Sequence, residues 1–287
     1  MKISEILKNN RCTVSFEVFP PKQWDKIEST KAVVDEMCKA NPSFMSVTYG
    51  ATGTKAGFTQ EIAEEIKRCG VTPLSHLTCL TSTKEKVDSV VDGLKAAGVE
   101  NILALRGDIP EGFVFPDEQY FEYAYQLVNE IKERGDFCIG GACYPEIHPE
   151  SKNRVEDMEH LKYKVDCGLD FLTSQMFFDN EKFLDFVEMC RIKGIDVPII
   201  AGIMPITNAR QIKRSIELSN CSVPKKFYKI MERFGDDDAS MLQAGIIYAT
   251  EQIIDLMANG INNIHIYTMN KPAVALQIMG GLSEIIR

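Results

Sequence analysis

The feature of this sequence that most restricts its fold is an eightfold alternation of short apolar runs with helical segments. Most of the runs are continuously apolar, and each is followed by a stretch whose apolar residues recur at helical spacing. The predicted strands cover residues 13–19, 44–49, 73–78, 101–105, 137–143, 171–175, 197–201 and 263–267. Continuous apolar strands separated by helices are typical of a parallel sheet that is covered on both faces.

Eight strand–helix units in 287 residues predict a (β/α)8 TIM barrel with extra helices near the C-terminal half. The predicted helices cover residues 2–9, 27–40, 58–69, 84–97, 118–133, 155–167, 181–193, 209–218, 224–234, 237–259 and 272–285. A doubly wound open sheet is the alternative architecture. No Pro- or Ser-rich linker divides the chain, so we expect one domain over residues 1–287.

The composition limits the cellular compartment and the binding partners that we expect for this protein. A net charge of −9 argues against binding to nucleic acid or to anionic lipid. The sequence contains neither a transmembrane run of about 18 apolar residues nor an apolar N-terminal signal. The nine cysteines form no Cys-x-x-Cys pair, which favours free thiols in a reducing cytoplasm.

One carboxylate interrupts the first predicted strand. Val14, Phe16 and Val18 share one face of that strand, and Glu17 lies on the other. A charged residue at this place can simply face solvent or pair with a cation. The alternative is a buried carboxylic acid whose pKa is raised, so that it donates a proton near neutral pH.

Polar and titratable residues gather after most of the predicted strands. In a parallel barrel the carboxyl ends of the strands meet at one face, where active sites form. A nearly complete ring of such residues therefore predicts a site. The residues are Glu17, Thr48, Tyr49, His76, Thr78, Cys79, Arg106, Asp108, Tyr144, Glu146, His148, Gln175, Asp179, Asn208, Gln211, Tyr267, Thr268, Asn270 and Lys271.

Several common chemistries lack their motifs here. There is no His-Glu-x-x-His or paired Cys-x-x-Cys sequence, so we expect no catalytic metal. The nucleophile turn Gly-x-Ser-x-Gly is missing. The glycines of residues 50–57 do not have P-loop spacing. No Gly-x-Gly-x-x-Gly follows a strand, so any dinucleotide must be held without a Rossmann turn.

Eight motifs together resemble one family, methylenetetrahydrofolate reductase in its bacterial form. They are SFEVFPP at 15–21, SVTYGA at 46–51, HLTC at 76–79, ALRGD at 104–108, YPEIHP at 144–149, QMFFD at 175–179, GIMP at 202–205 and HIYTMN at 265–270. They occur in the family's order over about 255 positions, which makes the resemblance specific where any single motif would be weak.

The resemblance implies a barrel that holds FAD and reduces 5,10-methylenetetrahydrofolate to 5-methyltetrahydrofolate by ping-pong hydride transfer. It implies that Glu17 is the general acid and that Asp108 tunes the flavin. The implied cofactor-binding residues are Thr48, His76, Arg106, Gly107, Asp108, Tyr144, His148, Asp157, His160 and Lys164. The implied substrate-binding residues are Glu17, Gln175, Gln211 and Lys271.

The resemblance leaves the electron donor open between NADH, NADPH and a partner protein, and it implies a cytoplasmic homo-oligomer without a regulatory domain. Four positions depart from the well-known form: Ser215 replaces a Phe, Lys271 an Arg, His160 an Asn and Tyr163 an Arg. Two other functions stay open from the residues themselves. One is a lyase or aldolase with a Schiff-base lysine, Lys55 or Lys271, and the other is a non-catalytic subunit that binds folate or a redox partner.

Overall fold

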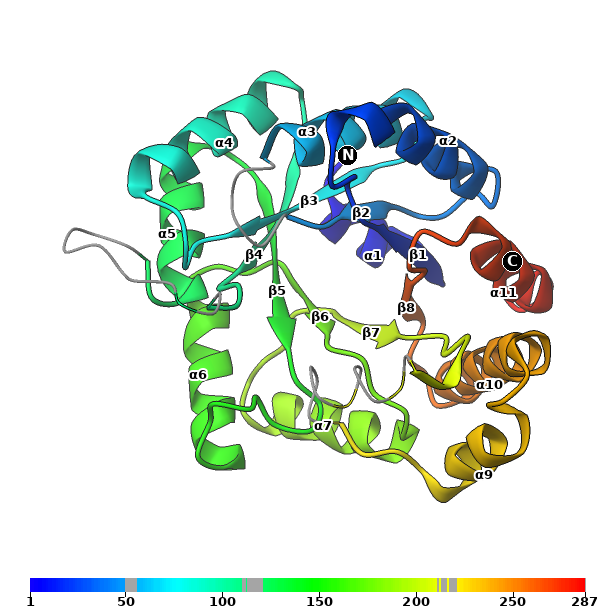
Figure 1. Cartoon of the computed structure of the whole chain (residues 1–287). Coiled ribbons are helices and arrows are strands. Elements are labelled where there is room, and N and C mark those ends of the chain that lie inside the picture. The colour runs from blue at the N-terminus through cyan, green and yellow to red at the C-terminus, as the bar shows by residue number, and fades with distance from the viewer. Residues whose placement is uncertain are drawn as a thin grey trace.

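Eight parallel strands form a closed barrel in the order β1 to β8, and helices surround it (Figure 1). The computed structural model describes residues 1–49, 56–109, 112, 121–210, 212, 216 and 221–286. The strands are β1 (Thr13–Val18), β2 (Met45–Val47), β3 (Pro73–Thr78), β4 (Asn101–Leu105), β5 (Cys138–Cys143), β6 (Phe171–Ser174), β7 (Ile199–Ile203) and β8 (Asn263–Tyr267). The predicted (β/α)8 barrel is confirmed, and the open sheet is wrong.

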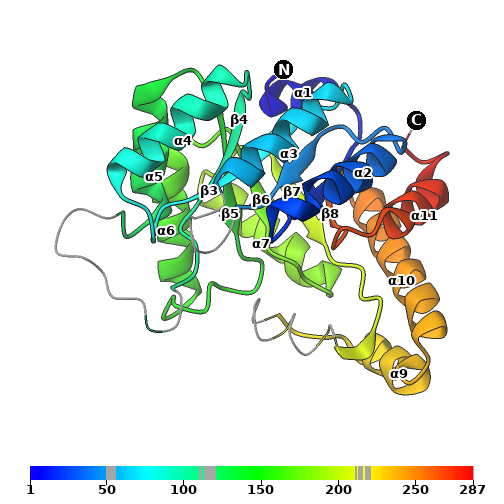
Figure 2. The same ribbon diagram turned by 45° about the horizontal axis from the view of Figure 1, so that its top comes forward.

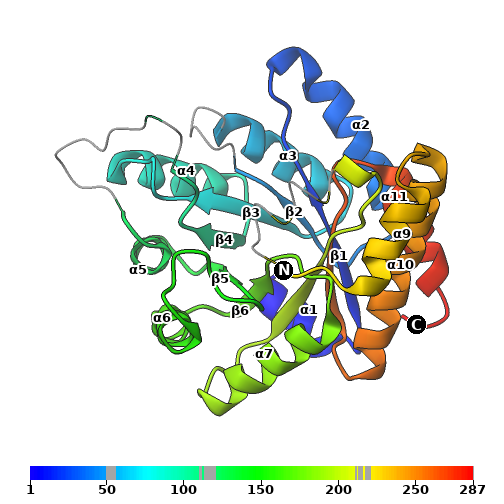
Figure 3. The same ribbon diagram turned by 60° about the horizontal axis from the view of Figure 1, so that its bottom comes forward.

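The helices are α1 (Ile3–Asn9), α2 (Ile27–Cys38), α3 (Ala56–Arg68), α4 (Lys84–Ala96), α5 (Ala124–Arg134), α6 (Arg154–Asp166), α7 (Asn180–Ile192), α9 (Lys225–Phe234), α10 (Asp238–Ala258) and α11 (Pro272–Leu282), with a short 3₁₀ turn, η1 (Trp24–Lys26). The extra helix expected in the C-terminal half is α9, which lies beside α10, and α10 in turn packs against α11 (Figure 3). Within the described residues, no helix is long and apolar enough to cross a membrane.

Several predicted boundaries are wrong, and for three of them the structure shows a physical reason. Helix α5 begins at Ala124 rather than 118, because the Gln126 side chain accepts the backbone N–H groups of residues 122 and 123 and caps the helix there. Strand β7 begins at Ile199 rather than 197, because Pro198 has no N–H to donate. Helix α11 ends at Leu282, three residues before the predicted end, in a turn closed by the N–H of Ile285.

Alternation along the strands separates an outer core from the barrel interior. Val14, Phe16 and Val18 of β1 pack outward beneath the helices, so Ser15 and Glu17 point inward. The lower part of the interior, at the amino ends of the strands, is apolar and is closed by α1. This lower core contains Ile3, Ile6, Leu7, Phe44, Leu74, Leu103, Cys138, Phe171 and Ile200. Figure 2 shows α1 at one end of the barrel and α9 at the other.

Candidate active site

A layer of polar side chains lies inside the barrel directly above the lower core. Side chains two residues apart on a strand point to the same face. On β3 and β6 the inward-facing residues after those of the lower core are therefore closer to the carboxyl ends of the strands, and the same holds for the inward-facing residues of β8. The polar upper layer is formed by Ser15, Glu17, Ser46, His76, Thr173, His265 and Tyr267. The same inward-facing positions thus carry apolar side chains in the lower interior and hydrogen-bonding side chains in the upper interior.

Glu17 is a buried acid. The residue is only 7% exposed, and burial alone raises the pKa of its carboxyl group to about 8. Its backbone carbonyl accepts a hydrogen bond from Thr268 Oγ1 at 2.7 Å, which ties β1 to the end of β8. The alternative of a solvated rim charge is therefore excluded by the burial of Glu17, and the raised pKa favours the neutral carboxylic acid at neutral pH.

His76 on β3 faces Glu17 across the interior. Its Nε2 lies 3.7 Å from Glu17 Oε2, and the two side chains are 7% and 10% exposed. Burial lowers the pKa of the imidazole to about 3, so at pH 7 both groups are neutral and the contact is not a salt bridge. His76 Nε2 has no hydrogen-bond partner among the described residues.

A second buried imidazole, His265, is fully engaged. Its Nδ1 lies 2.7 Å from Ser15 Oγ and its Nε2 lies 3.2 Å from Ser46 Oγ. Ser15 Oγ donates its own proton to the carbonyl of Ile264 at 3.0 Å, so the hydroxyl must accept from His265 Nδ1–H. The Nε2 atom then accepts from Ser46. These bonds fix one neutral tautomer, and burial lowers the pKa of His265 to about 3.

Tyr267 closes the upper layer next to β6 and β7. Its hydroxyl donates to the carbonyl of Ser174 at 2.6 Å, and burial raises its pKa well above the usual value. Gly202 leaves the room for this phenol, because a Cβ atom at position 202 would lie 2.6 Å from the Tyr267 hydroxyl and 2.3 Å from Ser174 O. The backbone N–H of Gly202 donates to Ser174 Oγ at 2.9 Å.

Arg106 and the turn after β5 form a charged rim outside the interior. The guanidinium binds both carboxylate oxygens of Glu150, with Nη1 at 2.6 Å from Oε2. This pairing raises the pKa of Arg106 and lowers that of Glu150. The Glu150 N–H donates to His148 Nδ1 at 3.1 Å, and the His148 ring lies edge-on to Tyr144 with centroids 4.5 Å apart.

Asp157 and Lys164 on α6 support this rim. The buried Asp157 carboxylate accepts the His148 N–H at 3.3 Å and the Ser151 hydroxyl at 2.9 Å. Lys164 donates to the carbonyl of Ala142 at 2.6 Å, and burial lowers its pKa. His160, on the same helix, is exposed.

The remaining predicted residues spread around the mouth. Gln175 is half-buried, and its Oε1 accepts the N–H of Met176 at 2.9 Å. Burial raises the pKa of the nearby Tyr144 phenol. Thr48 is half-buried after β2, and Asp108 is exposed after β4. Gly107 has φ 86°, a left-handed conformation, and a Cβ there would lie 3.0 Å from Thr78 Cβ.

Two lysines and one glutamine complete the predictions. Lys271 is exposed before α11 and donates to Thr207 Oγ1 at 2.7 Å, so it is not the buried amine that a Schiff-base enzyme needs. Gln211 and Lys55 lie outside the described residues, as does Ser215.

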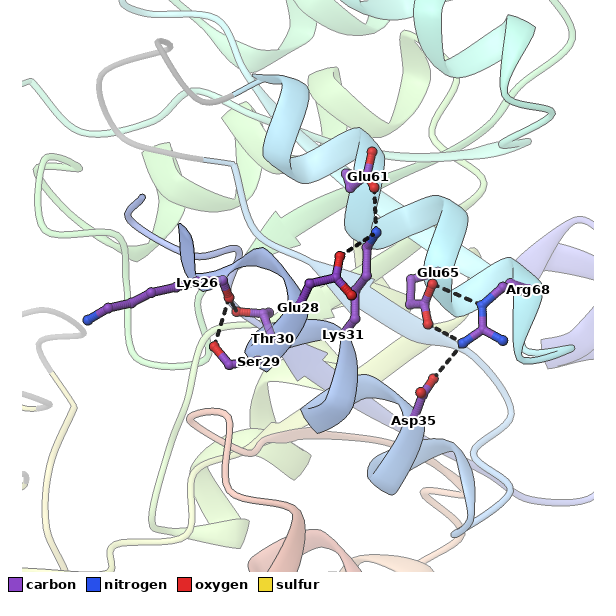
Figure 4. Close-up of polar contacts among 9 residues, drawn as sticks. All are labelled: Lys26, Glu28, Ser29, Thr30, Lys31, Asp35, Glu61, Glu65 and Arg68. Carbon is purple, nitrogen blue, oxygen red and sulfur yellow. Dashed lines mark hydrogen bonds and ion pairs between the residues drawn. The ribbon is translucent and has the colours of Figure 1, made fainter. Parts of the chain in front are cut away.

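A separate cluster between α2 and α3 contains residue types that can bind a metal ion, but an arginine guanidinium lies among them. The ligand atoms of Asp35, Glu65 and Cys69 lie within 4.8 Å of one another. Arg68 pairs with both carboxylates, at 3.0 Å from Asp35 Oδ1 and at 3.0 Å between Nε and Glu65 Oε2 (Figure 4). Because Arg68 already supplies the positive charge, this cluster is an ion-pair network that joins two helices.

Sequence reasoning missed the roles of His265 and Glu150. His265 belongs to a motif that resembles the family, and its two-residue spacing from Tyr267 was a signal that both face inward. Glu150 follows His148 by two residues, but only the fold shows that it binds Arg106. The structure brings Glu17 and His76 together at the interior and Arg106, Tyr144 and His148 at the rim, while His160 stands apart on the surface of α6.

The fold and the site together define a (β/α)8 barrel enzyme with a buried acid at the carboxyl end of its first strand. A family model described as "Methylenetetrahydrofolate reductase" matches residues 2–283. The chain belongs to the methylenetetrahydrofolate reductase family, and it is an enzyme of methylenetetrahydrofolate reduction.

Several named relatives agree. A 5,10-methylenetetrahydrofolate reductase of Pectobacterium carotovorum is 35% identical over 269 residues, covering 93% of this chain and 89% of the relative. The Escherichia coli (strain K12) enzyme of the same name is 35% identical over 266 residues, covering 92% and 88%. An Arabidopsis thaliana relative, "Methylenetetrahydrofolate reductase (NADH) 1", is 36% identical over 99% of this chain, which spans 50% of that protein's length.

Among solved structures, the barrel resembles an uncharacterized protein from Clostridium thermocellum that binds two copies of 5-methyl-5,6,7,8-tetrahydrofolic acid. The TM-score is 0.67 with 13% identity, and the match covers 99% of this chain and 100% of the other. At this level of identity the likeness concerns the fold.

Proposed function

We propose that the chain reduces 5,10-methylenetetrahydrofolate to 5-methyltetrahydrofolate with bound FAD and that Glu17 is its general acid. The observation that carries this proposal is the buried carboxyl group inside the barrel, whose pKa is raised to about 8. An acid with such a pKa keeps its proton at neutral pH and gives it up to a basic leaving group. We place the substrate above Glu17, at the mouth of the barrel.

The chemistry of the substrate requires such a proton. The methylene carbon bridges two nitrogens, and it accepts a hydride only after one carbon–nitrogen bond has opened. Glu17 would donate its O–H proton to the leaving nitrogen, which keeps the electron pair of the broken bond, and Glu17 would become a carboxylate. Gln175 would donate to and accept from the edge of the pterin ring.

We expect the rim to hold a flavin dinucleotide without a Rossmann turn. Arg106 and Lys164 supply cations near the turn after β5, and a diphosphate would replace Glu150 as the partner of Arg106. Because Gly107 has no side chain, the cofactor could approach its backbone closely. Thr48, His76, Asp108, Tyr144, His148 and Asp157 would complete the pocket, and bound FAD would carry the hydride from reductant to folate.

The reductant in this proposal is a nicotinamide. Relatives named for NADH support that class of donor, and Lys271 and Gln211 would contact the folate. We also infer an assembly of identical subunits in the cytoplasm. Because His160 is exposed, we favour Lys164 over His160 as a cofactor contact.

Flavin content and half-reactions test the proposal. The purified protein should be yellow, take up FAD, and convert methyltetrahydrofolate to the methylene form with menadione as acceptor. Anaerobic stopped-flow mixing with NADH, NADPH or reduced ferredoxin in turn should identify the donor by the rate of flavin bleaching. A colourless protein that takes up no FAD would contradict the proposal, as would a flavoprotein without folate turnover.

A further inference from the structure

His76 and Glu17 face each other inside the barrel without a hydrogen bond between them. Each comes from a different strand, both are more than nine-tenths buried, and their facing atoms are 3.7 Å apart. That distance is longer than a hydrogen bond. Buried polar atoms are nearly always paired, so an unpaired Nε2 beside a carboxyl group calls for a functional explanation.

The neighbouring imidazole shows what a structural histidine looks like in this barrel. His265 uses both ring nitrogens, each on a serine hydroxyl. His76 has the same burial and a similarly lowered pKa, yet its Nε2 faces only Glu17. The two histidines therefore differ in hydrogen bonding rather than in environment, and His76 is the one with a nitrogen to offer.

Two other titratable groups among the described residues lie near the pair. Tyr267 approaches Glu17 from β8, and His265 approaches His76 from the same strand. Neither is charged at neutral pH, because burial disfavours the ionised form of each. Among the lysine, arginine and histidine side chains of the described residues, His76 is the one that lies within 4.0 Å of a Glu17 carboxyl oxygen, so we consider it as the group that stabilises the carboxylate.

We propose that His76 is a positioning residue for the acid: its Nε2–H donates to Glu17 Oε2, keeping the transferable proton on Oε1. When Glu17 gives its proton to the leaving nitrogen, negative charge spreads to Oε2, and the neutral Nε2–H donor stabilises it without transferring its own proton. This inference rests on the proposed function, because it assigns His76 a part in the same proton transfer.

The open distance fits this role. Hydrogen bonds of catalytic acids are often long in ligand-free proteins and shorten when the substrate binds. Closing the gap from 3.7 Å to about 2.9 Å requires only a small rotation of either side chain. A donor that meets a developing charge favours the transition state over the ground state.

Infrared titration of the purified protein tests the pair directly. The C=O stretching band of a protonated carboxyl disappears on ionisation, and Glu17→Gln identifies which band belongs to Glu17. In the wild type that band should vanish with a midpoint near pH 8. In His76→Leu the midpoint should rise by about 1 to 2 pH units, because the carboxylate has lost its donor.

Matched variants separate this role from a merely structural one. His76→Gln places an amide N–H near the position of Nε2 and should restore the wild-type midpoint. Ser75→Ala removes the other unpartnered buried atom of β3, on the opposite face, and should leave the band unchanged. If His76→Leu does not fold, His76→Asn, whose amide is too short to reach, should show the same upward shift.

The pH profile gives a second readout. The rate of the folate half-reaction should fall about 10- to 100-fold in His76→Leu, and its alkaline limb should move to higher pH together with the infrared midpoint. An unchanged midpoint in His76→Leu would overturn the inference, even with active enzyme. A shifted midpoint in a protein that does not turn over folate would support the pair and refute the proposed function instead.

Discussion

The two ends of the barrel interior are built from the same strands but differ in how their buried polar groups are paired. At the lower end, Ile3 and its apolar neighbours fill the space, and every polar atom of Asn101 has a partner. Its Oδ1 accepts from Ile3 N at 2.8 Å, and its Nδ2 donates to Met1 O and Pro73 O at 3.1 Å each. At the upper end, His76 Nε2 and Thr173 Oγ1 are buried without partners in the described part of the chain.

This difference separates stability from function within one core. Satisfied groups hold a fold together, whereas buried groups without partners cost stability unless a ligand meets them. The lower end therefore resembles the inside of any stable protein, and the upper end resembles a binding site, where buried polar groups are available to a ligand. Changes at the two ends should consequently affect different measurements.

The largest expected effect is on turnover at the upper end. Glu17→Gln should lower the rate of methylenetetrahydrofolate reduction by roughly 10²- to 10⁴-fold, because the amide cannot donate an acidic proton. Flavin reduction by the nicotinamide should stay near the wild-type rate. Glu65→Gln, which changes a buried glutamate that pairs with Arg68 outside the barrel, is the matched control and should turn over normally. Equal losses in both half-reactions would refute the acid role.

At the lower end the effect should fall on stability instead. Asn101→Ala should lower the free energy of unfolding by about 3–4 kcal/mol, because three backbone groups lose their buried partner. Asn259→Ala, at the exposed end of α10, should change it by no more than about 0.5 kcal/mol. Urea denaturation compares the two variants, and a stability loss in Asn101→Ala no larger than in the control would show that the lower end is not sealed by Asn101.

The buried acid should also give stability a dependence on pH. The Glu17 pKa is about 8 in the folded protein against 4.5 for an ordinary Glu. Above 4.5 the unfolded chain ionises while the folded one holds its proton, so the contribution of this group falls as pH rises toward 8. Glu17→Gln should thus be more stable than wild type at pH 7 by about 3 kcal/mol, because each pH unit between 4.5 and 7 contributes about 1.4 kcal/mol.

Denaturation at several pH values measures this gain. It should be close to zero at pH 4.5, grow up to about pH 8, and stay constant above. A gain that does not change with pH would mean that Glu17 is ionised in the folded protein.

The smallest expected effect contrasts two threonines. Thr173→Val at the upper end removes an unpaired hydroxyl and should leave the protein equally stable or more stable by up to about 1 kcal/mol. Thr13→Val, at the lower end of β1, breaks a 3.0 Å hydrogen bond to Asn263 Oδ1 and should cost about 1 kcal/mol. Thermal unfolding of both variants resolves the sign, and a loss at Thr173 would show that its hydroxyl has a partner.

The sequence was sufficient for the architecture because every strand carries its own local signal. Continuous apolar runs such as that of β4 predict buried parallel strands without knowledge of their neighbours. The limits of β7 and α5 do not follow from periodicity, because they depend on Pro198 and on the Gln126 cap.

The site was predictable as a set but not as an arrangement. The carboxyl ends of the strands identified Glu17, His76 and Arg106 as site residues. Whether Glu17 is buried, and which residue meets it, depends on how eight strands close around one axis, and no local pattern encodes that. Likewise Arg106 pairs with Glu150 across 44 positions, a contact that only the folded chain creates.

The position of α1 has a consequence for the order in which the chain assembles on the ribosome. Ile3, Ile6 and Leu7 are synthesised before the other members of the lower core, and Leu103, Phe171 and Ile200 of that cluster emerge much later. Before Leu103 emerges, only Phe44 and Leu74 of this cluster are available to cover the apolar face of α1. Closure of the lower end is therefore a late step, and the nascent chain must keep its first helix from aggregating until β7 has been made.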